Sequence, residues 1–443
     1  MRFFCFQKGM RIETLYQLFL ENPVISTDSR TVEKDSIFFA LKGDRFNGND
    51  FAQEAMNKGA VRAVVDEKKF AVNGHFIVVE NVLSTLQELA AYHRNQLDIP
   101  ILAITGSNGK TTTKELIRSI LEKKYKVLAT KGNLNNHIGV PLTLLSLKHD
   151  HQVGIIEMGA NHQGEIMNLC RIADPELGLI TNIGRAHLEG FGSEEVIRKA
   201  KGELYDYLGS KEGKVYVNNE NNLLLQMLTD FRGKIIRYGK GKESSCTGVI
   251  ERSYPYLQVR VQTGELNQEE VMINTRLVGD YNLENIMAAV CVGNDFGLDS
   301  TYLADSIENY TPDLLRSQFI QTDKNSLVAD SYNANPSSME AALQSFGADP
   351  HPDKILVLGE MKELGENVEP EHIRLVNMIR MLNFTRVFLI GNIFFSIQIP
   401  EDYKLFRDVD GIMKWPGISE IRNAKILIKG SRLMQLERLI QLF

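Results

Sequence analysis

One short stretch constrains the fold of this chain more than any other: residues 101–113, which read ILAITGSNGKTTT. It opens with branched apolar residues typical of a buried strand, and residues 116–121 after it place apolar side chains at helical spacing. Between them, Gly106 and Gly109 allow the backbone to turn its N–H groups toward one point. A strand, a glycine-containing loop and a helix in this order predict a phosphate-binding loop, because the helix adds the positive end of its dipole.

The residues that close this loop have the chemistry of a nucleotide site. The ammonium of Lys110 can reach outer phosphates, and the hydroxyl of Thr111 can bind Mg²⁺. The strict pattern has a glycine at the position of Ile104, so the match is partial, and the alternative is a glycine turn before an ordinary helix. The flanking strand and helix favour the phosphate loop. The residues expected to hold the nucleotide are Gly106, Ser107, Asn108, Gly109, Lys110, Thr111 and Thr112.

Composition narrows the class of protein. A chain of 443 residues is long for a single core, and its net charge of −6 argues against a general nucleic-acid binder. No apolar run is long enough to span a bilayer, and the apolar patch in residues 1–9 is too short for a signal peptide. Met10 is an alternative start, with residues 1–9 as a dispensable lead. The cysteines lie far apart without a CxxC pair, which indicates reduced thiols in a cytoplasmic protein; they are Cys5, Cys170, Cys246 and Cys291.

The order of apolar segments predicts an α/β protein of three domains: 1–95, 96–311 and 312–443. The first is a small α/β domain with strands expected at 37–41, 61–65 and 76–79 and helices at 51–58 and 84–95. In the middle domain strands alternate with helices, which predicts a mainly parallel sheet covered on both faces, followed by a β-rich stretch at 234–275 and a helix at 282–293. The last domain is a Rossmann-like open sheet with its ligand edge at the strand C-termini; its expected strands are 327–330, 354–358, 386–390 and 424–428.

Polar residues at predicted strand ends are the further site candidates. Glu157 ends a strand expected beside the phosphate loop, where a carboxylate can bind Mg²⁺. His187 follows the strand 177–183, although a lone histidine is more often structural, and Lys201 lies on a helix, where a lysine is normally solvated. Two loops that combine small polar residues with an arginine, 26–30 and 43–49, are either anion sites or solvated turns.

Short motifs along nearly the whole chain match one family: Asp28–Arg30, Phe38–Gly43, Thr105–Thr112, Asn133–Pro141, Glu157–Gly159, Ala200–Glu203, Asp330–Pro336, Leu358–Gly365 and Lys429–Arg432. With them the chain resembles the Mur ligases, a family that itself lacks the first glycine of the strict loop pattern. The resemblance implies a uridine-nucleotide domain, then an ATP-binding domain, then a ligase domain.

The resemblance also implies roles by position. Lys110, His187 and Lys201 would be catalytic, and Lys201 is similar to the lysine that the family carries as an N-carbamate. Mg²⁺ would be held by Thr111, Glu157, His187 and Lys201. Besides the loop, ATP would contact Asn282, Asn285, Arg316, Asp330 and one of the pair Asn135 and Asn136, of which we expect Asn136. The substrate contacts would include Ser29, Arg30, Asn333 and Asn335.

The activity that the resemblance implies is ATP-dependent peptide ligation in cytoplasmic peptidoglycan precursor synthesis, with ATP and Mg²⁺ required. The partners would be UDP-N-acetylmuramoyl-tripeptide and D-alanyl-D-alanine, with no nucleic acid, no membrane insertion and a monomeric enzyme. Two positions depart from the family pattern, which often has histidine where this chain has Tyr281 and Asn49.

Other readings stay open on the residues alone. The nearest are the family member that adds the third residue and a folate polyglutamate synthase, but residues 333–336 and 361–365 favour the dipeptide-adding type. A nucleotide-binding switch would not need His187, Lys201 or a uridine domain. An oxidoreductase is disfavoured because no GxGxxG motif opens a helix in the last domain.

Overall fold

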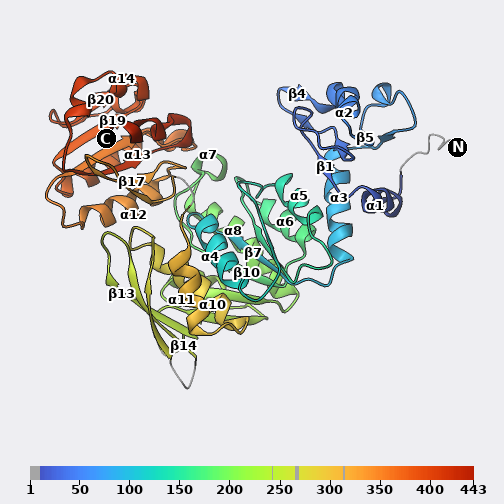
Figure 1. The fold of residues 1–443 in the computed structure, drawn as a ribbon, viewed down its shortest axis with the longest axis horizontal. Helices are drawn as coiled ribbons and strands as arrows, with labels where there is room; N and C mark the ends of the chain where they lie inside the picture. Colours follow the sequence, from blue (N-terminus) through green and yellow to red (C-terminus); the bar gives the residue numbers. More distant parts are fainter. Residues whose placement is uncertain (1–9, 242, 265–268, 313–314) are drawn as a thin grey trace. The chain divides into compact units, whose positions relative to one another are not determined.

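The structure is a computed structural model that describes residues 10–241, 243–264, 269–312 and 315–443 (Figure 1). Contacts within the chain define two compact units: one of residues up to 104 with 125–160 and 164–178, and one of residues 105–124, 161–163 and 179–443. Residues 1–9, with Cys5 and the alternative start before Met10, lie outside the described part, as does Asp313 beside the predicted boundary. The predicted boundaries after residues 95 and 311 stay predictions.

The first unit begins with a parallel sheet in the order β1-β2-β5-β6. Its core includes Phe38, Ala63 and Val65, which alternate along their strands toward α2, and the predicted strands are confirmed with shorter ends. Helix α1 and strand β1 escaped the sequence analysis. The elements are α1 (Ile12–Glu21), β1 (Ile25–Ser26), β2 (Ile37–Phe39), α2 (Ala52–Asn57), β5 (Arg62–Val65), β6 (Phe76–Val78) and α3 (Val82–Asn95).

The same unit carries the strand that leads to the phosphate loop. Strand β7 (Ile101–Thr105) pairs in parallel with β9 (Val153–Glu157), which pairs on its other side with β8 (Val127–Ala129). In this register Glu157 lies opposite Ile104, two residues before Gly106. Helices α5 (Gly139–Leu145) and α6 (Glu165–Ala173) complete the unit.

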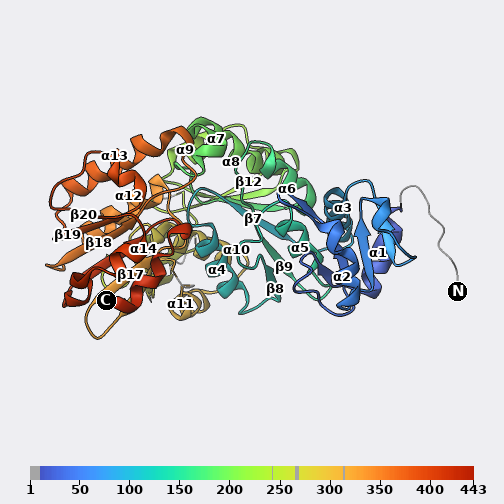
Figure 2. The same cartoon turned by 90° about the horizontal axis from the view of Figure 1, so that it is seen from above.

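The second unit begins at the loop with α4 (Lys110–Leu121), which lies beside α10 (Asn282–Asp295) in Figures 1 and 2. Strands β11, β12 and β13 are parallel neighbours, whereas β14 and β15 continue the row antiparallel. The β-rich stretch predicted at 234–275 is therefore confirmed. The elements are α7 (Leu188–Phe191), α8 (Glu194–Ser210), β11 (Lys214–Asn218), β12 (Lys234–Tyr238), β13 (Cys246–Arg252), β14 (Gln258–Thr263), β15 (Glu269–Asn274) and α11 (Ser300–Asn309).

The second unit also contains what we call the C-terminal sheet, with the order β16-β17-β21-β18-β19-β20. Strand β16 is antiparallel to β17, and the other neighbours are parallel. Figure 2 shows α12 and α13 on one side of this sheet and α14 on the other. The elements are β16 (Gln318–Gln321), β17 (Ser326–Asp330), α12 (Pro336–Gly347), β18 (Lys354–Gly359), α13 (Val368–Met381), β19 (Arg386–Ile390), β20 (Lys404–Phe406), α14 (Val409–Met413) and β21 (Lys425–Lys429).

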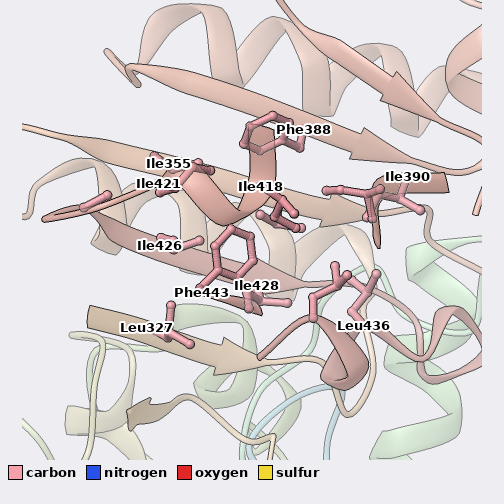
Figure 3. Packing of buried hydrophobic residues seen from close by; sticks show 14 of the residues in the cluster. Leu327, Ile355, Phe388, Ile390, Ile418, Ile421, Ile426, Ile428, Leu436 and Phe443 are labelled. Atoms are coloured by element: carbon pink, nitrogen blue, oxygen red, sulfur yellow. The ribbon is translucent and has the colours of Figure 1, made fainter. Parts of the chain in front are cut away.

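The core on the α14 side of the C-terminal sheet is apolar, with aliphatic and aromatic side chains packed together (Figure 3). Leu327, Ile355 and Ile426 point into it from three neighbouring strands, and Leu436 and Phe443 close it from the last turns of the chain. Because side chains alternate along a strand, residues such as Asp330 and Lys429 face the side of α12 and α13 instead. The buried charge of Lys429 and the partly buried charge of Asp330 are therefore kept out of this apolar core.

Within the described part of the chain, no helix is both long and apolar enough to cross a membrane. The cysteines in that part, Cys170, Cys246 and Cys291, are buried and form no disulfide.

Candidate functional site

The phosphate loop has a backbone that requires glycine at two positions. Gly106 has a φ of +143° and Gly109 a φ of +79°. A Cβ atom at Gly106 would lie 2.0 Å from Thr181 Oγ1, and one at Gly109 would lie 2.4 Å from Asn285 Oδ1. Both the conformation and the space therefore exclude a side chain, as the sequence pattern predicted.

The turn after β10 (Leu177–Ile180) holds the loop in this conformation. Asn182 accepts two loop N–H groups, that of Ser107 on its carbonyl at 2.9 Å and that of Asn108 on its Oδ1 at 3.0 Å. Thr181 Oγ1 donates to the carbonyl of Asn108 at 2.6 Å. The sequence predicted a strand over 177–183 that includes Thr181 and Asn182, whereas β10 ends at Ile180 and leaves both residues in the turn that holds the loop.

Lys110 lies where a phosphate-binding cation is needed. Its ammonium donates to the carbonyls of Gly106 at 2.7 Å and Ser107 at 3.3 Å, so the charge is held over the loop. Helix α4 begins at Lys110, and the positive end of its dipole faces the same loop. Thr111 follows with its side chain nearly buried. These features fit a bound phosphate chain.

Asn282 and Asn285 form a buried hydrogen-bond chain beneath the loop. Asn285 Oδ1 accepts from Thr113 Oγ1 at 3.0 Å, and Asn285 Nδ2 donates to Asn282 Oδ1 at 2.8 Å. Asn282 Nδ2 then donates to the carbonyl of Val278 at 2.8 Å. In the structure these amides fix α10 against the first turn of α4, and their contact with adenine stays a prediction.

We expect Asn285→Ala to destabilise the protein by about 1–3 kcal/mol, because it leaves buried groups of Thr113 and Asn282 without partners. Thermal unfolding of the purified protein measures this as a lower Tm. The control is Asn309→Ala, which removes an amide that bonds to Asp305 on an exposed helix face. It should shift the stability by about 0.5 kcal/mol or less. Equal effects of the two changes would contradict a structural role for Asn285.

Glu157 is buried at the end of β9, with 2% of its surface exposed. Its Oε1 accepts from Asn135 Nδ2 at 2.8 Å, and the carbonyl of Asn135 accepts from Gly159 N at 2.7 Å. The side chain of Asn136, the predicted ATP contact, accepts the N–H groups of Ile138 and Gly139 at the start of α5. Asn135 is therefore the asparagine beside the carboxylate, and the contact of Asn136 with ATP stays a prediction.

His187 and Glu363 form a pair, and both have left-handed backbone, with φ of +52° and +61°. His187 Nδ1 lies 2.5 Å from Glu363 Oε2, and the imidazole lowers the pKa of the Glu363 carboxyl. With Nδ1 facing a carboxylate, Nε2 is the nitrogen that remains for a metal. This contact with Glu363 does not have hydrogen-bond geometry, so the metal role of His187 stays a prediction.

Lys201 is buried on α8, with 2% of its surface exposed and its ammonium 5.3 Å from the centre of the Phe191 ring. An ammonium has no lone pair for a metal, so the predicted metal role requires the carbamate form. Among the described residues, no group of three or more histidine, cysteine or acidic side chains is placed to hold a metal ion. The magnesium site expected from the sequence therefore stays a prediction.

The motif at residues 330–336, which reads DSYNANP, contacts the phosphate loop. Asn335 Nδ2 donates to Asn108 Oδ1 at 2.9 Å, while Asn335 Oδ1 caps α12 by accepting from Ser338 N. Next to it, Ser337 Oγ accepts from Arg185 N at 2.7 Å. Asn333 accepts from the N–H of its own neighbour, Ala334. The structure therefore brings Asn335 to the loop, as expected of a residue at the ligand edge of the sheet.

The predicted uridine contacts lie on a loop of the first unit. Arg30 is exposed and ion-paired with Asp28 at 2.6 Å, which lowers the pKa of that carboxyl to about 2. The carbonyl of Ser29 accepts from Lys58 at 2.8 Å. Asn49, where the family often has histidine, is fully buried and donates to Asp66 at 2.8 Å, so it supports the sheet rather than a ligand.

Comparison with known proteins gives matches along the chain. Residues 23–103 match the model described as Mur ligase family, catalytic domain; residues 104–293 match the Mur ligase middle domain; and residues 315–414 match the Mur ligase, glutamate ligase domain. The chain is 36% identical over 428 residues to the UDP-N-acetylmuramoyl-tripeptide–D-alanyl-D-alanine ligase of Haemophilus influenzae. This match covers 94% of this chain and 92% of the Haemophilus influenzae protein.

Solved structures agree with these matches. A crystal structure of MurF from Acinetobacter baumannii has a TM-score of 0.85 at 30% identity and covers 94% of this chain and 92% of its own. A crystal structure of MurF ligase from Thermotoga maritima in complex with ADP has a TM-score of 0.83 at 27% identity, and the match covers 96% of this chain and 97% of that chain. By its fold, its loop and these relatives, the chain belongs to the Mur ligase family.

Proposed function

We propose that this protein uses ATP to join D-alanyl-D-alanine to the C-terminal carboxylate of UDP-N-acetylmuramoyl-tripeptide, releasing ADP and phosphate. The observation that carries the proposal is the hydrogen bond from Asn335 to Asn108. It places the motif that favours dipeptide addition on the phosphate loop itself. The names of the relatives from Haemophilus influenzae and Acinetobacter baumannii support the same choice.

The reaction needs ATP because a carboxylate and an amine form a stable salt at neutral pH rather than an amide. Attack of the tripeptide carboxylate on the γ-phosphate gives an acyl phosphate and ADP. The amine of the dipeptide then attacks the acyl carbon and phosphate leaves. Developing negative charge on the transferred phosphoryl group has to be neutralised by groups that are already in place.

The loop residues are arranged for this task. Lys110 is held over the loop by carbonyls that it can exchange for phosphate oxygens, and the dipole of α4 points to the same place. When bound, Mg²⁺ would neutralise phosphate charge, with Thr111, Glu157, His187 and carbamylated Lys201 as the residues proposed to hold it. Asn335 and Ser337 bring α12 to the loop and to Arg185. Closing of the site during the reaction would keep water away from the acyl phosphate.

Other roles extend the proposal. Ser29 and Arg30 would hold the uridine nucleotide, Asn333 the peptide substrate, and Arg316 and Asp330 the ATP. The three predicted domains would bind the sugar nucleotide, bind ATP and admit the dipeptide in turn. We further propose that the enzyme acts as a monomer in the cytoplasm, where UDP-linked precursors and ATP are available.

Release of phosphate tests the proposal directly. With ATP, Mg²⁺ and UDP-N-acetylmuramoyl-tripeptide present, adding D-alanyl-D-alanine should raise steady-state phosphate release at least about tenfold, because the acyl phosphate turns over only when an amine takes the acyl group. A single amino acid in place of the dipeptide should give little increase. Release that ignores the dipeptide would indicate a nucleotide switch, and a preference for a single diamino acid would indicate the ligase that adds the third residue.

A further inference from the structure

Lys429, the first residue of the motif Lys429–Arg432, is a buried charge that makes no contact with the phosphate loop among the hydrogen bonds described. Its side chain is 2% exposed, and its ammonium donates to Asp330 Oδ2 at 2.5 Å. The two residues lie opposite each other in the register of β17 and β21. A buried ammonium needs a carboxylate partner, so this pair fixes one oxygen of Asp330.

The other oxygen of Asp330 fixes the segment Leu315–Ser317. Asp330 Oδ1 accepts from the N–H of Ser317 at 3.2 Å, and Tyr332 N donates to the carbonyl of Leu315 at 3.1 Å. Leu315 and Ser317 have φ of +74° and +53°, a conformation that is unfavourable for residues with a side chain. The end of β17 therefore holds this strained segment from both sides of Arg316.

Arg316 lies between these two anchors, with its guanidinium carbon 3.6 Å from the centre of the Tyr332 ring. Ser317 is held a second time, since its Oγ lies 2.6 Å from the hydroxyl of Tyr281 at the start of α10. Tyr281 is one of the two departures from the family pattern noted in the sequence. Burial raises the pKa of the Tyr281 hydroxyl well above its ordinary value, and the negative charge of Asp330 raises it further. The hydroxyl therefore stays protonated.

We propose that Lys429 and Tyr281 are positioning residues for ATP: together they hold Asp330 and the segment Leu315–Ser317, so that Arg316 and Asp330 meet the nucleotide in one fixed arrangement. This inference rests on the proposed function, in which Arg316 and Asp330 contact ATP. Without Lys429, the Asp330 carboxylate is free to turn, the N–H of Ser317 loses its acceptor, and the segment can relax to an ordinary backbone conformation.

The chain offers a matched control for Lys429. Lys425 lies four residues earlier on β21, on the same face of the strand, and is 6% exposed. It is likewise ion-paired with an aspartate, Asp349, but at the opposite end of the strand from Lys429 and Asp330. Lys425→Met and Lys429→Met therefore remove the same kind of buried ion pair from the same strand.

The test compares steady-state kinetics of the two variants in the full-length enzyme. Lys429→Met should raise the KM for ATP at least about tenfold while leaving the KM for D-alanyl-D-alanine within about twofold. Lys429→Arg should recover part of the loss, because it keeps the charge. Lys425→Met should lower the Tm but leave the KM for ATP unchanged. Equal KM values for ATP in both methionine variants would overturn the inference.

A second pair of variants tests Tyr281 without disturbing the fold. Tyr281→Phe and Ser317→Ala each remove one hydroxyl of the same contact, so each should raise the KM for ATP by a few-fold, and the double variant should be no worse than either. Unchanged or fully additive KM values would remove Tyr281 from the proposal. Failure of the wild-type enzyme to ligate the dipeptide would reject the proposed function, whereas an active wild type with an unaffected Lys429→Met would reject this inference alone.

Discussion

Lys110→Ala is expected to lower ATP-dependent phosphate release by about 100-fold or more, the range found when one preorganised charge or donor is removed from a transition-state site. The reason is geometric. The ammonium already lies 2.7 Å from the carbonyl of Gly106, at the start of α4, and no other lysine of the loop can take its place. Coupled measurement of phosphate at saturating substrates checks the result.

Two further variants show whether the lower rate of Lys110→Ala is specific to the position and shape of this side chain. Lys110→Arg keeps the charge but presents a planar fork where a compact ammonium is required, so it should recover little activity. Lys123→Ala removes a lysine just after the same helix, one that is ion-paired with Asp305, and should leave the rate within about twofold because exposed ion pairs contribute little. Near-normal turnover of Lys110→Ala would show that the loop does not bind the reacting phosphates.

Gly106→Ala is the second change with a large expected effect. The added methyl group would lie 2.0 Å from Thr181 Oγ1, and the φ of +143° at this position is nearly closed to alanine. The loop must therefore shift, and Thr181 must give up its bond to the carbonyl of Asn108. We expect ATP binding, measured by equilibrium titration, to weaken by about 100-fold or more, since each 1.4 kcal/mol of strain or lost contact is a factor of ten.

The matched control is Gly164→Ala. Gly164 also has a left-handed backbone, with φ of +91°, but nothing lies within 4 Å of the added methyl group. Gly164→Ala should lower the free energy of unfolding by about 1–2 kcal/mol, because alanine is unfavourable in a left-handed backbone conformation. It should leave the affinity for ATP unchanged. If Gly106→Ala bound ATP as the wild type does, the conformation of the loop would have no part in nucleotide binding.

The elements that the sequence predicted well are those with a local cause. The strand at 101–105, the glycine loop and the helix from Lys110 follow from apolar periodicity and from backbone chemistry confined to a few residues. The strands at 354–359 and 386–390 were recognised because buried parallel strands are continuous apolar runs. Short elements such as β1 and β20 have too few residues for a pattern and escaped notice.

The contacts that build the site could not be predicted in the same way, because they join residues far apart in the chain. Asn335 meets Asn108 across more than two hundred residues, and His187 meets Glu363 across nearly as many. Neither contact follows from a regular spacing of residues, so no sequence pattern predicts it. Family resemblance named most of these residues, but it did not indicate that Asn182 fixes the loop or that Tyr281 holds Ser317.

The order of strands in the C-terminal sheet has a consequence for biosynthesis. Strand β21 comes last in the sequence but lies between β17 and β18, so those two strands have no direct ladder to each other among the described residues. A nascent chain must therefore emerge from the ribosome beyond Lys429 before this sheet can close, and until then its inner edges stay open to chaperones. Synthesis that stalls earlier yields a polypeptide with its phosphate loop complete but with Asp330 lacking Lys429 as its partner.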